Sequence, residues 1–259
     1  RGDLFWNRRT LLDATGQSEM IALAYKQYET CLRYDGNNTD CMLKKAGIDI
    51  AKRQYDEARN LINGALKINE YLPFAYYLRG RMYKETGDTT LAYSSYKTAI
   101  DVDPTYYDAY IEIGLIYSKE KNDLAQEYFS SAIDIKPNSV EAYYAKAMFL
   151  QETGFRDANR YNLAFACYDS ILKIEPKFFA AHFNKGFVHL EYLQNYQQGI
   201  DEFNQAIAAF PGYYQAYYNR GLCYESLGLK QSAEADYRAA LQIVPTYTEA
   251  ALALGRILK

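Results

Sequence analysis

Small and aromatic residues recur along most of this chain in a fixed order that ends in a proline. The recurring sets are Ala92, Tyr96 and Ala99 before Pro104; Ala125, Phe129 and Ala132 before Pro137; Ala164, Tyr168 and Ile171 before Pro176; Gly199, Phe203 and Ala206 before Pro211; and Ala233, Tyr237 and Ala240 before Pro245. The intervals between these prolines are 33, 39, 35 and 34 residues. A period near 34 residues indicates stacked helical pairs rather than one globular core.

A further small residue precedes each set and completes a predicted pair of helices. These residues are Gly80, Gly114, Ala147, Gly186 and Gly221. Small residues on both helices let the two backbones approach closely as a hairpin. The ring, four residues after the second small residue, lies on the same helical face and is expected to fill the wedge against the next helix. Each proline ends a second helix because it has no N–H to donate.

The predicted turns inside the helix pairs contain residues that break or cap helices. They lie at residues 86–88, 121–123 and 227–229. Asp88 is expected to be the N-cap of the helix that carries Ala92 and Tyr96, with its side chain accepting a backbone hydrogen bond.

The pattern resembles the tetratricopeptide repeat (TPR) family over residues 39–259. The resemblance implies an all-α fold, a right-handed superhelical solenoid of stacked antiparallel helix pairs, which we expect to extend over residues 1–259 as a single solenoid. Clear repeats are predicted at 73–106, 107–139, 140–178, 179–213 and 214–247. Residues 5–38 and 39–72 look like degenerate repeats, with Glu70 where proline is expected in the second of them. Residues 248–259 look like a capping helix that covers the last hairpin.

The repeat at 140–178 is longer than the others, and its extra chain lies within residues 151–162. We interpret it as a longer loop between the helices or as an extended helix. The alternative is a contact element that projects from one edge of the solenoid.

Composition narrows the possible partners. The net charge is −3, and basic residues do not cluster, so neither a nucleic acid nor an anionic membrane surface is favoured as a partner. No apolar run approaches the roughly 18 residues that a membrane span needs. Tyrosine is unusually frequent, at 28 residues, and such rings either fill the space between helices or line a contact surface.

The cysteines and histidines do not form a predicted metal site. Cys167 and Cys223 stand alone, while Cys31 and Cys41 lie on neighbouring predicted helices and can pair, although free, buried thiols are the favoured interpretation for all four cysteines. His182 and His189 share one helical face at aromatic positions of the repeat, which favours a packing role.

Motifs for catalysis or cofactor binding are not found in the sequence. It has no glycine-rich phosphate loop, zinc-protease motif or serine-hydrolase motif, and residues 35–40 lack the spacing of a calcium loop. We therefore expect no enzymatic activity, no cofactor and no bound metal.

The resemblance also implies where a partner binds, because certain positions of the first helix face a concave groove in the TPR family. The corresponding groove residues here are Phe74, Tyr77, Arg81, Ile111, Glu112, Tyr144, Met148, Phe183, Asn184, Phe187, Tyr218 and Asn219, and Asp108, Leu115, Glu141, Gln215 and Leu222 share the same positions. Alternatively, the rings pack against adjacent repeats and stay covered. Glu112 and Glu141 disfavour a clamp for the acidic tail of a chaperone.

These observations predict a non-catalytic scaffold that binds a protein or peptide in an aromatic-lined concave groove. The alternative is a structural TPR protein that assembles into homo-oligomers through its ends or through residues 151–162. The sequence begins at Arg1 without methionine, and we expect a targeting segment to be missing. The chain is similar to bacterial TPR proteins of the cell envelope, which favours that location over the cytoplasm.

Overall fold

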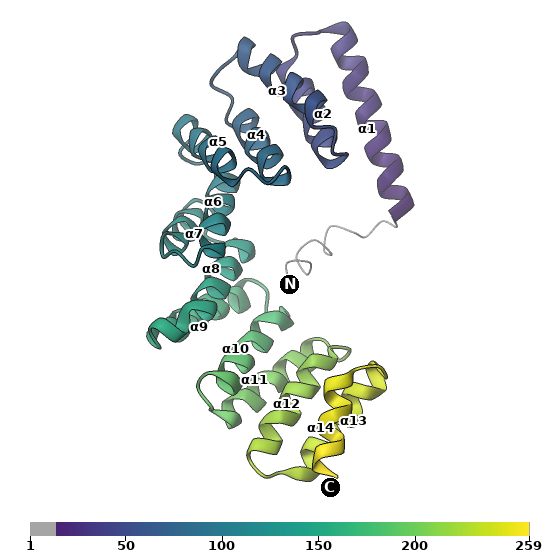
Figure 1. Ribbon diagram of the computed structural model, residues 1–259, viewed down its shortest axis with the longest axis vertical. Helices are drawn as coiled ribbons and strands as arrows, with labels where there is room; N and C mark the ends of the chain where they lie inside the picture. Colours follow the sequence, from purple (N-terminus) through teal and green to yellow (C-terminus); the bar gives the residue numbers. More distant parts are fainter. Residues whose placement is uncertain (1–13, 259) are drawn as a thin grey trace. The chain divides into compact units, whose positions relative to one another are not determined.

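The computed structural model describes residues 14–258, with side chains described from Met20 onward. These residues form fourteen α-helices and one short 3-10 helix, and no β-strand occurs among them (Figure 1). The chain divides into two compact units, Arg1–Pro137 (unit 1) and Asn138–Lys259 (unit 2). Each unit is described by itself.

Unit 1 consists of one long helix followed by three antiparallel helix pairs. In chain order its helices are α1 (Ala14–Tyr34), α2 (Thr39–Ala51), α3 (Tyr55–Ile68), α4 (Pro73–Glu85), α5 (Thr89–Val102), α6 (Tyr107–Lys119) and α7 (Leu124–Ile135). The pairs α2/α3, α4/α5 and α6/α7 match the predicted repeats at 39–72, 73–106 and 107–139. The first helix of the predicted repeat at 5–38 falls largely outside the described residues.

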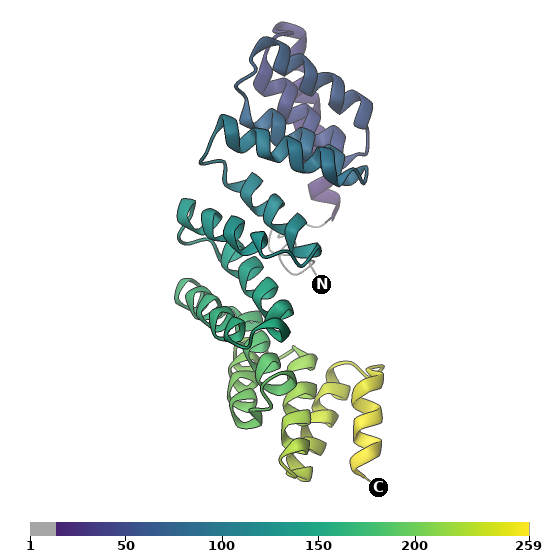
Figure 2. The same ribbon diagram turned by 60° about the vertical axis from the view of Figure 1, so that its left-hand side comes forward.

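Unit 2 consists of three helix pairs and a final single helix, as Figures 1 and 2 show. In chain order it contains α8 (Val140–Thr153), the 3-10 helix η2 (Gly154–Arg156), α9 (Asn159–Ile174), α10 (Phe179–Glu191), α11 (Tyr196–Ala209), α12 (Tyr214–Ser226), α13 (Lys230–Ile243) and α14 (Thr248–Ile257). The all-α fold of stacked helix pairs is therefore confirmed.

The prolines end the second helices, with one exception. Pro104, Pro137, Pro176, Pro211 and Pro245 each lie two residues beyond the last residue of a second helix. Pro73 instead occupies the first turn of α4, where its missing N–H would have no helical acceptor. Pro73 therefore starts a helix, while the degenerate pair α2/α3 ends without proline.

The recurring ring of each second helix packs on the small residue of the first helix in the same pair. Tyr96, Phe129, Tyr168, Phe203 and Tyr237 are fully buried. A Cβ atom added to Gly114 would lie 2.5 Å from Cε1 of Phe129, and one added to Gly80 would lie 2.5 Å from Cε1 of Tyr96. The glycines thus let the two helices of a pair approach, and the ring fills the space inside its own pair as well as toward the next helix.

The turns inside five helix pairs each contain one residue with positive φ. These residues are Arg53, Gly87, Lys121, Gln194 and Gly228, with φ of 60°, 87°, 52°, 53° and 75°. Asp88 then caps α5, because its Oδ1 accepts a hydrogen bond of 2.9 Å from the N–H of Leu91, as the sequence predicted.

The extra residues of the 140–178 repeat lengthen its helices. Helix α8 runs to Thr153, η2 follows directly, and α9 has 16 residues. The ring of Tyr161 packs on Gly154, while Phe155 at the bend is 67% exposed. The extra chain thus forms both a longer connection, residues 154–158 with η2, and a longer α9, which agrees with the interpretation of a longer loop or an extended helix.

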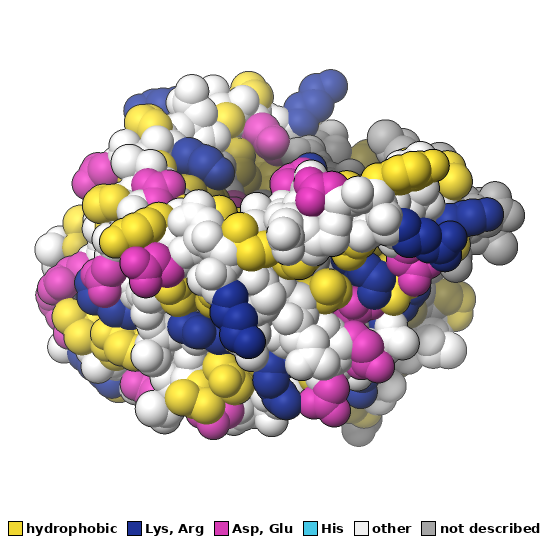
Figure 3. All heavy atoms as spheres, turned by 90° about the horizontal axis from the view of Figure 1, so that it is seen from above, with side chains coloured by type: hydrophobic (Ala, Val, Ile, Leu, Met, Phe, Trp, Pro, Cys, Tyr) yellow, Lys and Arg dark blue, Asp and Glu magenta, His cyan; other side chains and the backbone are white. Residues whose placement is uncertain are grey.

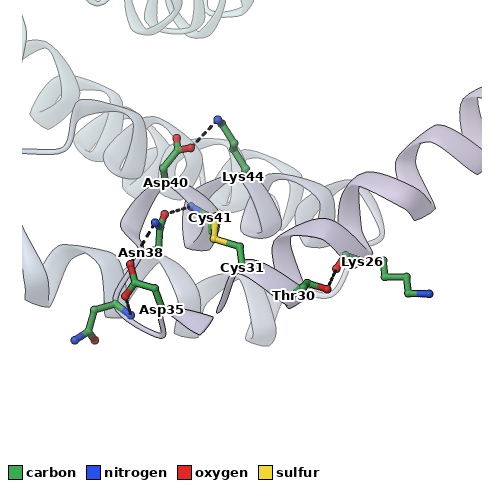
Figure 4. The surroundings of a disulfide bond; sticks show 9 residues. Lys26, Thr30, Cys31, Asp35, Asn38, Asp40, Cys41 and Lys44 are labelled. Atoms are coloured by element: carbon green, nitrogen blue, oxygen red, sulfur yellow. Dashed lines mark hydrogen bonds and ion pairs between the residues drawn. A yellow bond between two sulfur atoms is a disulfide. The ribbon is translucent and has the colours of Figure 1, made fainter. Parts of the chain in front are cut away.

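A disulfide joins Cys31 at the end of α1 to Cys41 at the start of α2, so the expectation that these two thiols are free was wrong (Figure 4). The turn between the helices accounts for the pairing. Asn38 caps α2 by accepting a hydrogen bond from the N–H of Cys41, and Asp35 accepts one from the N–H of Asn37. This compact turn places the two Cα atoms 6.5 Å apart. Cys167 and Cys223 are free and buried, as expected.

We expect Gly114→Ala to lower the free energy of unfolding by about 1–3 kcal/mol, because the added Cβ overlaps the fully buried ring of Phe129. The matched control is Gly255→Ala, since a Cβ at Gly255 in α14 meets no atom within 4 Å. That control should raise stability by up to about 1 kcal/mol through helix propensity. Urea unfolding followed by circular dichroism measures both changes, and equal effects of the two substitutions would contradict the ring-on-glycine packing.

Candidate functional site

All twelve predicted groove residues lie on first helices, namely α4, α6, α8, α10 and α12. Five of them belong to unit 1 and seven to unit 2. None is fully exposed: Ile111, Asn184 and Asn219 are buried, and the other nine are half-buried. We call these two sets the first-helix face of unit 1 and the first-helix face of unit 2.

Four rings of these faces pack against a second set of rings that sequence reasoning missed. The missed residues, Tyr106, Phe178, Tyr213 and Tyr247, each stand directly before a first helix and two residues after a proline. The ring pairs, with centroid distances, are Tyr77–Tyr106 (5.5 Å), Tyr144–Phe178 (5.8 Å), Phe183–Tyr213 (4.9 Å) and Tyr218–Tyr247 (5.2 Å). The signal that could have found them is the proline–any residue–aromatic sequence, which occurs at all four places.

The same rings also contact the buried ring of their own pair. Tyr77 lies 5.8 Å from Tyr96, Phe183 lies 5.7 Å from Phe203, and Tyr218 lies 5.8 Å from Tyr237. Each first-helix ring is therefore held on two sides while one part stays accessible. These rings therefore pack against neighbouring rings, as one alternative predicted, and also contribute to the surface of the first helices, as the other predicted.

In unit 1 the polar groups of the face differ in how they are paired. Glu112 of α6 forms an ion pair with Lys84 of α4, with Nζ and Oε2 2.5 Å apart. The expected repulsion of a carboxylate by Glu112 is thus offset by a lysine that the sequence argument did not place there. Half-buried Arg81 has no hydrogen bond or ion pair with any described residue, although its charge opposes the rise that burial produces in the pKa of Tyr96 and Tyr106.

In unit 2 two buried asparagines lie one repeat apart at the same position. The Nδ2 of Asn184 donates to the hydroxyl of Tyr144 over 3.1 Å, and the Nδ2 of Asn219 donates to the carbonyl of Gln215 over 2.7 Å. The Oδ1 atoms of both asparagines accept no hydrogen bond from the described residues, and Oε1 of Gln215 is buried without a partner. Burial raises the pKa of Tyr144, so this hydroxyl stays protonated. The face therefore carries unused amide acceptors beside its ring pairs.

The two histidines have different surroundings. His182 Nδ1 lies 2.7 Å from Oε2 of Glu202, and Lys185 contacts Glu202 and Asp169 at 2.6 and 2.9 Å. The predicted packing role of His182 therefore includes a polar contact with Glu202. His189 stacks on Phe165 with centroids 4.8 Å apart, and its Nδ1 is buried without a partner.

The described residues contain neither a metal site nor a membrane span. Over the described residues, no three His, Cys, Asp or Glu side chains come together in a way that could hold a metal ion. Within the same part of the chain, every helix is too short or too polar to span a bilayer. Acidic and basic side chains are interspersed on the surface viewed in Figure 3, so this view shows no patch of a single charge.

Models of the tetratricopeptide repeat match residues 75–106, 107–139 and 187–248. These segments cover the helix pairs α4/α5 and α6/α7 and most of the last two pairs. The chain belongs to the tetratricopeptide repeat family.

Relatives and solved structures agree with this assignment. The human tetratricopeptide repeat protein 6 is 30% identical over 66% of this chain and 32% of its own length. Anaphase-promoting complex subunit 3 of Schizosaccharomyces pombe is 24% identical over 82% of this chain and 31% of its own length. The crystal structure of the C-terminal part of a TPR protein from Cytophaga hutchinsonii matches with a TM-score of 0.74 at 18% identity, covering 92% of this chain and 96% of that one. The chain spans about one third of these curated relatives, and the structural match shows the fold alone.

Acidification is expected to weaken unit 2 through His189. Burial against Phe165 lowers the pKa of His189, with Glu202 acting in the opposite direction and Lys185 in the same direction. The unfolded chain therefore takes up this proton at a higher pH than the folded protein does. The stability that neutral His189 contributes is complete above pH 6.5 and is lost as the pH falls below it, by at most about 1.4 kcal/mol per pH unit.

His189→Tyr tests this pH dependence, because tyrosine occupies the same position in three other repeats, at Tyr83, Tyr117 and Tyr224. Urea unfolding at pH 7.5 and pH 5.5 should show a larger loss of stability in the wild type than in the variant. An equal loss in both proteins would mean that His189 is not the responsible group.

Proposed function

We propose that this chain is a non-catalytic scaffold that binds an extended polypeptide on the first-helix face of unit 2. The equivalent face of unit 1, with Phe74, Tyr77, Arg81, Ile111 and Glu112, would provide a separate contact surface. The observation that carries the proposal is the pair of unused amide acceptors on Asn184 and Asn219 beside the ring pairs.

The amide acceptors suit the backbone of an extended chain. A polypeptide in extended conformation presents N–H donors that can pair with the Oδ1 atoms of Asn184 and Asn219. Asn184 is linked directly to the ring of Tyr144, so the polar and aromatic groups belong to one surface. The asparagines would fix the direction of the bound chain, while the rings would accept side chains of varied sequence.

The rings are suited to binding because they are already held in place. Phe183 contacts both Phe203 and Tyr213, and Tyr218 contacts both Tyr237 and Tyr247. A ring that is fixed before binding loses little conformational freedom when a partner covers it. Met148 and Phe187 would extend the apolar area along α8 and α10.

The comparisons support an interaction role at a coarser level. The chain is a TPR protein, and one relative is named as a subunit of the anaphase-promoting complex. Self-assembly is the second candidate, and exposed leucines at the final helix favour it. Leu252 of α14 is 69% exposed, and Leu258, directly after this helix, is 58% exposed.

We also propose an oxidising compartment such as the bacterial cell envelope as the location. The Cys31–Cys41 disulfide supports this proposal, since such bonds persist mainly in proteins outside the reducing cytosol.

The test uses random twelve-residue peptides displayed on phage and selected against the purified chain. The affinity of a selected synthetic peptide is then measured by fluorescence anisotropy for the wild type and for Asn184→Ala/Asn219→Ala. We expect about thirtyfold weaker binding by the double variant, because two hydrogen bonds of about 1 kcal/mol each are lost.

The matched control is Asn60→Ala/Asn63→Ala, which removes two exposed asparagines from the second helix α3. This control should bind the peptide as the wild type does, and circular dichroism should show unchanged helicity in all three proteins. Peptides whose affinity survives the Asn184/Asn219 substitutions would place the site elsewhere. Concentration-dependent oligomers in light scattering, with no peptide bound, would favour self-assembly.

A further inference from the structure

The described side chains of helix α1 lie outside the core cluster formed by α2, α3 and α4. Among its described side chains, from Met20 to Tyr34, none is fully buried. The core formed by α2, α3 and α4, which includes Leu43, Ile62 and Leu78, contains no α1 residue even among its partly buried members. The described part of α1 therefore contributes half-buried side chains such as Ala24, Tyr28 and Leu32 but no fully buried one, whereas burial of apolar side chains normally fixes a helix in a solenoid.

Helix α14, the last described helix, is attached to its neighbours through buried side chains. Ala250 and Ala253 of α14 are buried, and Ala253 belongs to a core cluster with Ala233 and Tyr237 of α13. Helix α14 is thus held by the same kind of packing as the helices before it, whereas the described part of α1 has no fully buried side chain.

Two kinds of contact hold α1 against α2. One is the covalent bond between Cys31 and Cys41, shown in Figure 4. The other is noncovalent and includes Tyr25 of α1, whose hydroxyl accepts a hydrogen bond of 2.7 Å from Nζ of Lys45. Nζ of Lys52 also lies 3.8 Å from the centroid of the Tyr25 ring. The disulfide is therefore the strongest described connection between the two helices.

We propose that the Cys31–Cys41 bond is a redox-sensitive latch that holds α1 against α2, and that its reduction releases α1 while the helix pairs from α2 to α7 stay folded. Both cysteines are half-buried, so a small dithiol can reach the bond, whereas Cys167 and Cys223 are buried free thiols in unit 2.

The reduction is an ordinary thiol–disulfide exchange. One thiolate of the dithiol attacks a sulfur of the Cys31–Cys41 bond and forms a mixed disulfide, and the other cysteine leaves as a thiolate that takes up a proton. The second thiol of the reagent then attacks the mixed disulfide. Two electrons pass to the protein, Cys31 and Cys41 end as thiols, and the dithiol ends as a disulfide.

Release is expected to be confined to α1, because α1 and α2 differ in the contacts that remain after the disulfide is reduced. Without the bond, the described part of α1 is held by noncovalent contacts such as that of Tyr25 and by its chain connection, and helices in proteins owe most of their stability to packing against other elements. Helices α2, α3 and α4 keep their shared core in either redox state. The cap of α2 by Asn38 also needs no disulfide.

Hydrogen–deuterium exchange with mass spectrometry tests the latch on the whole chain, before and after treatment with dithiothreitol. We expect backbone amides of residues 20–34 to lose protection by about tenfold or more on reduction, while amides in α4 and α5 keep theirs. Cys31→Ser/Cys41→Ser should show the same loss without reductant and no further change with it.

Three controls can each overturn the proposal. Alkylation of the untreated protein must leave Cys31 and Cys41 unmodified, and modification of both would show that the bond does not form. Tyr25→Ala must keep α1 protected while the bond is oxidised, since release by this change alone would make Tyr25 the latch. Unchanged protection of α1 on reduction, or an equal loss across α2 to α5, would also contradict a local latch.

Discussion

Contact between one aromatic ring and one small residue governs the geometry of every clear repeat in this protein. The ring of Phe129 lies so close to the Cα of Gly114 that a single added carbon would overlap it, and Tyr96 on Gly80 is the same contact one repeat earlier. This contact fixes how closely the helices of a pair approach. It thereby determines which residues of the first helix can turn away from the core.

The candidate binding faces follow from that arrangement. A first-helix ring such as Phe183 rests on the buried ring of its own pair and on the ring that precedes the next first helix. The same side chain therefore stabilises the fold and contributes accessible apolar surface. Removing a ring would disturb both roles, whereas Asn184 and Asn219 have polar groups whose loss can be separated from the core packing.

The helix pairs could be predicted because their close packing requires small and aromatic residues at regular intervals along the sequence. Contacts between residues outside this periodic pattern could not be predicted. Lys84 and Glu112 are 28 positions apart and meet only because α4 and α6 are neighbours. The role of Pro73 was also missed, since proline is compatible with both the end of one helix and the first turn of the next. The burial of Asn184 and Asn219 could not be predicted, because it depends on where the surrounding rings lie in the fold.

The disulfide shows a second limit of the repeat pattern, because a repeat stacks only where both neighbours supply apolar side chains. At the C-terminal end, small residues of α14 complete the core of α13. The described part of α1 instead has only half-buried or exposed side chains, and Leu23 is 59% exposed. A covalent bond can hold such a helix because it does not depend on the area that the helix buries. The two terminal helices of the described chain are therefore attached by different physical means, and only one of these depends on the redox state of the surroundings.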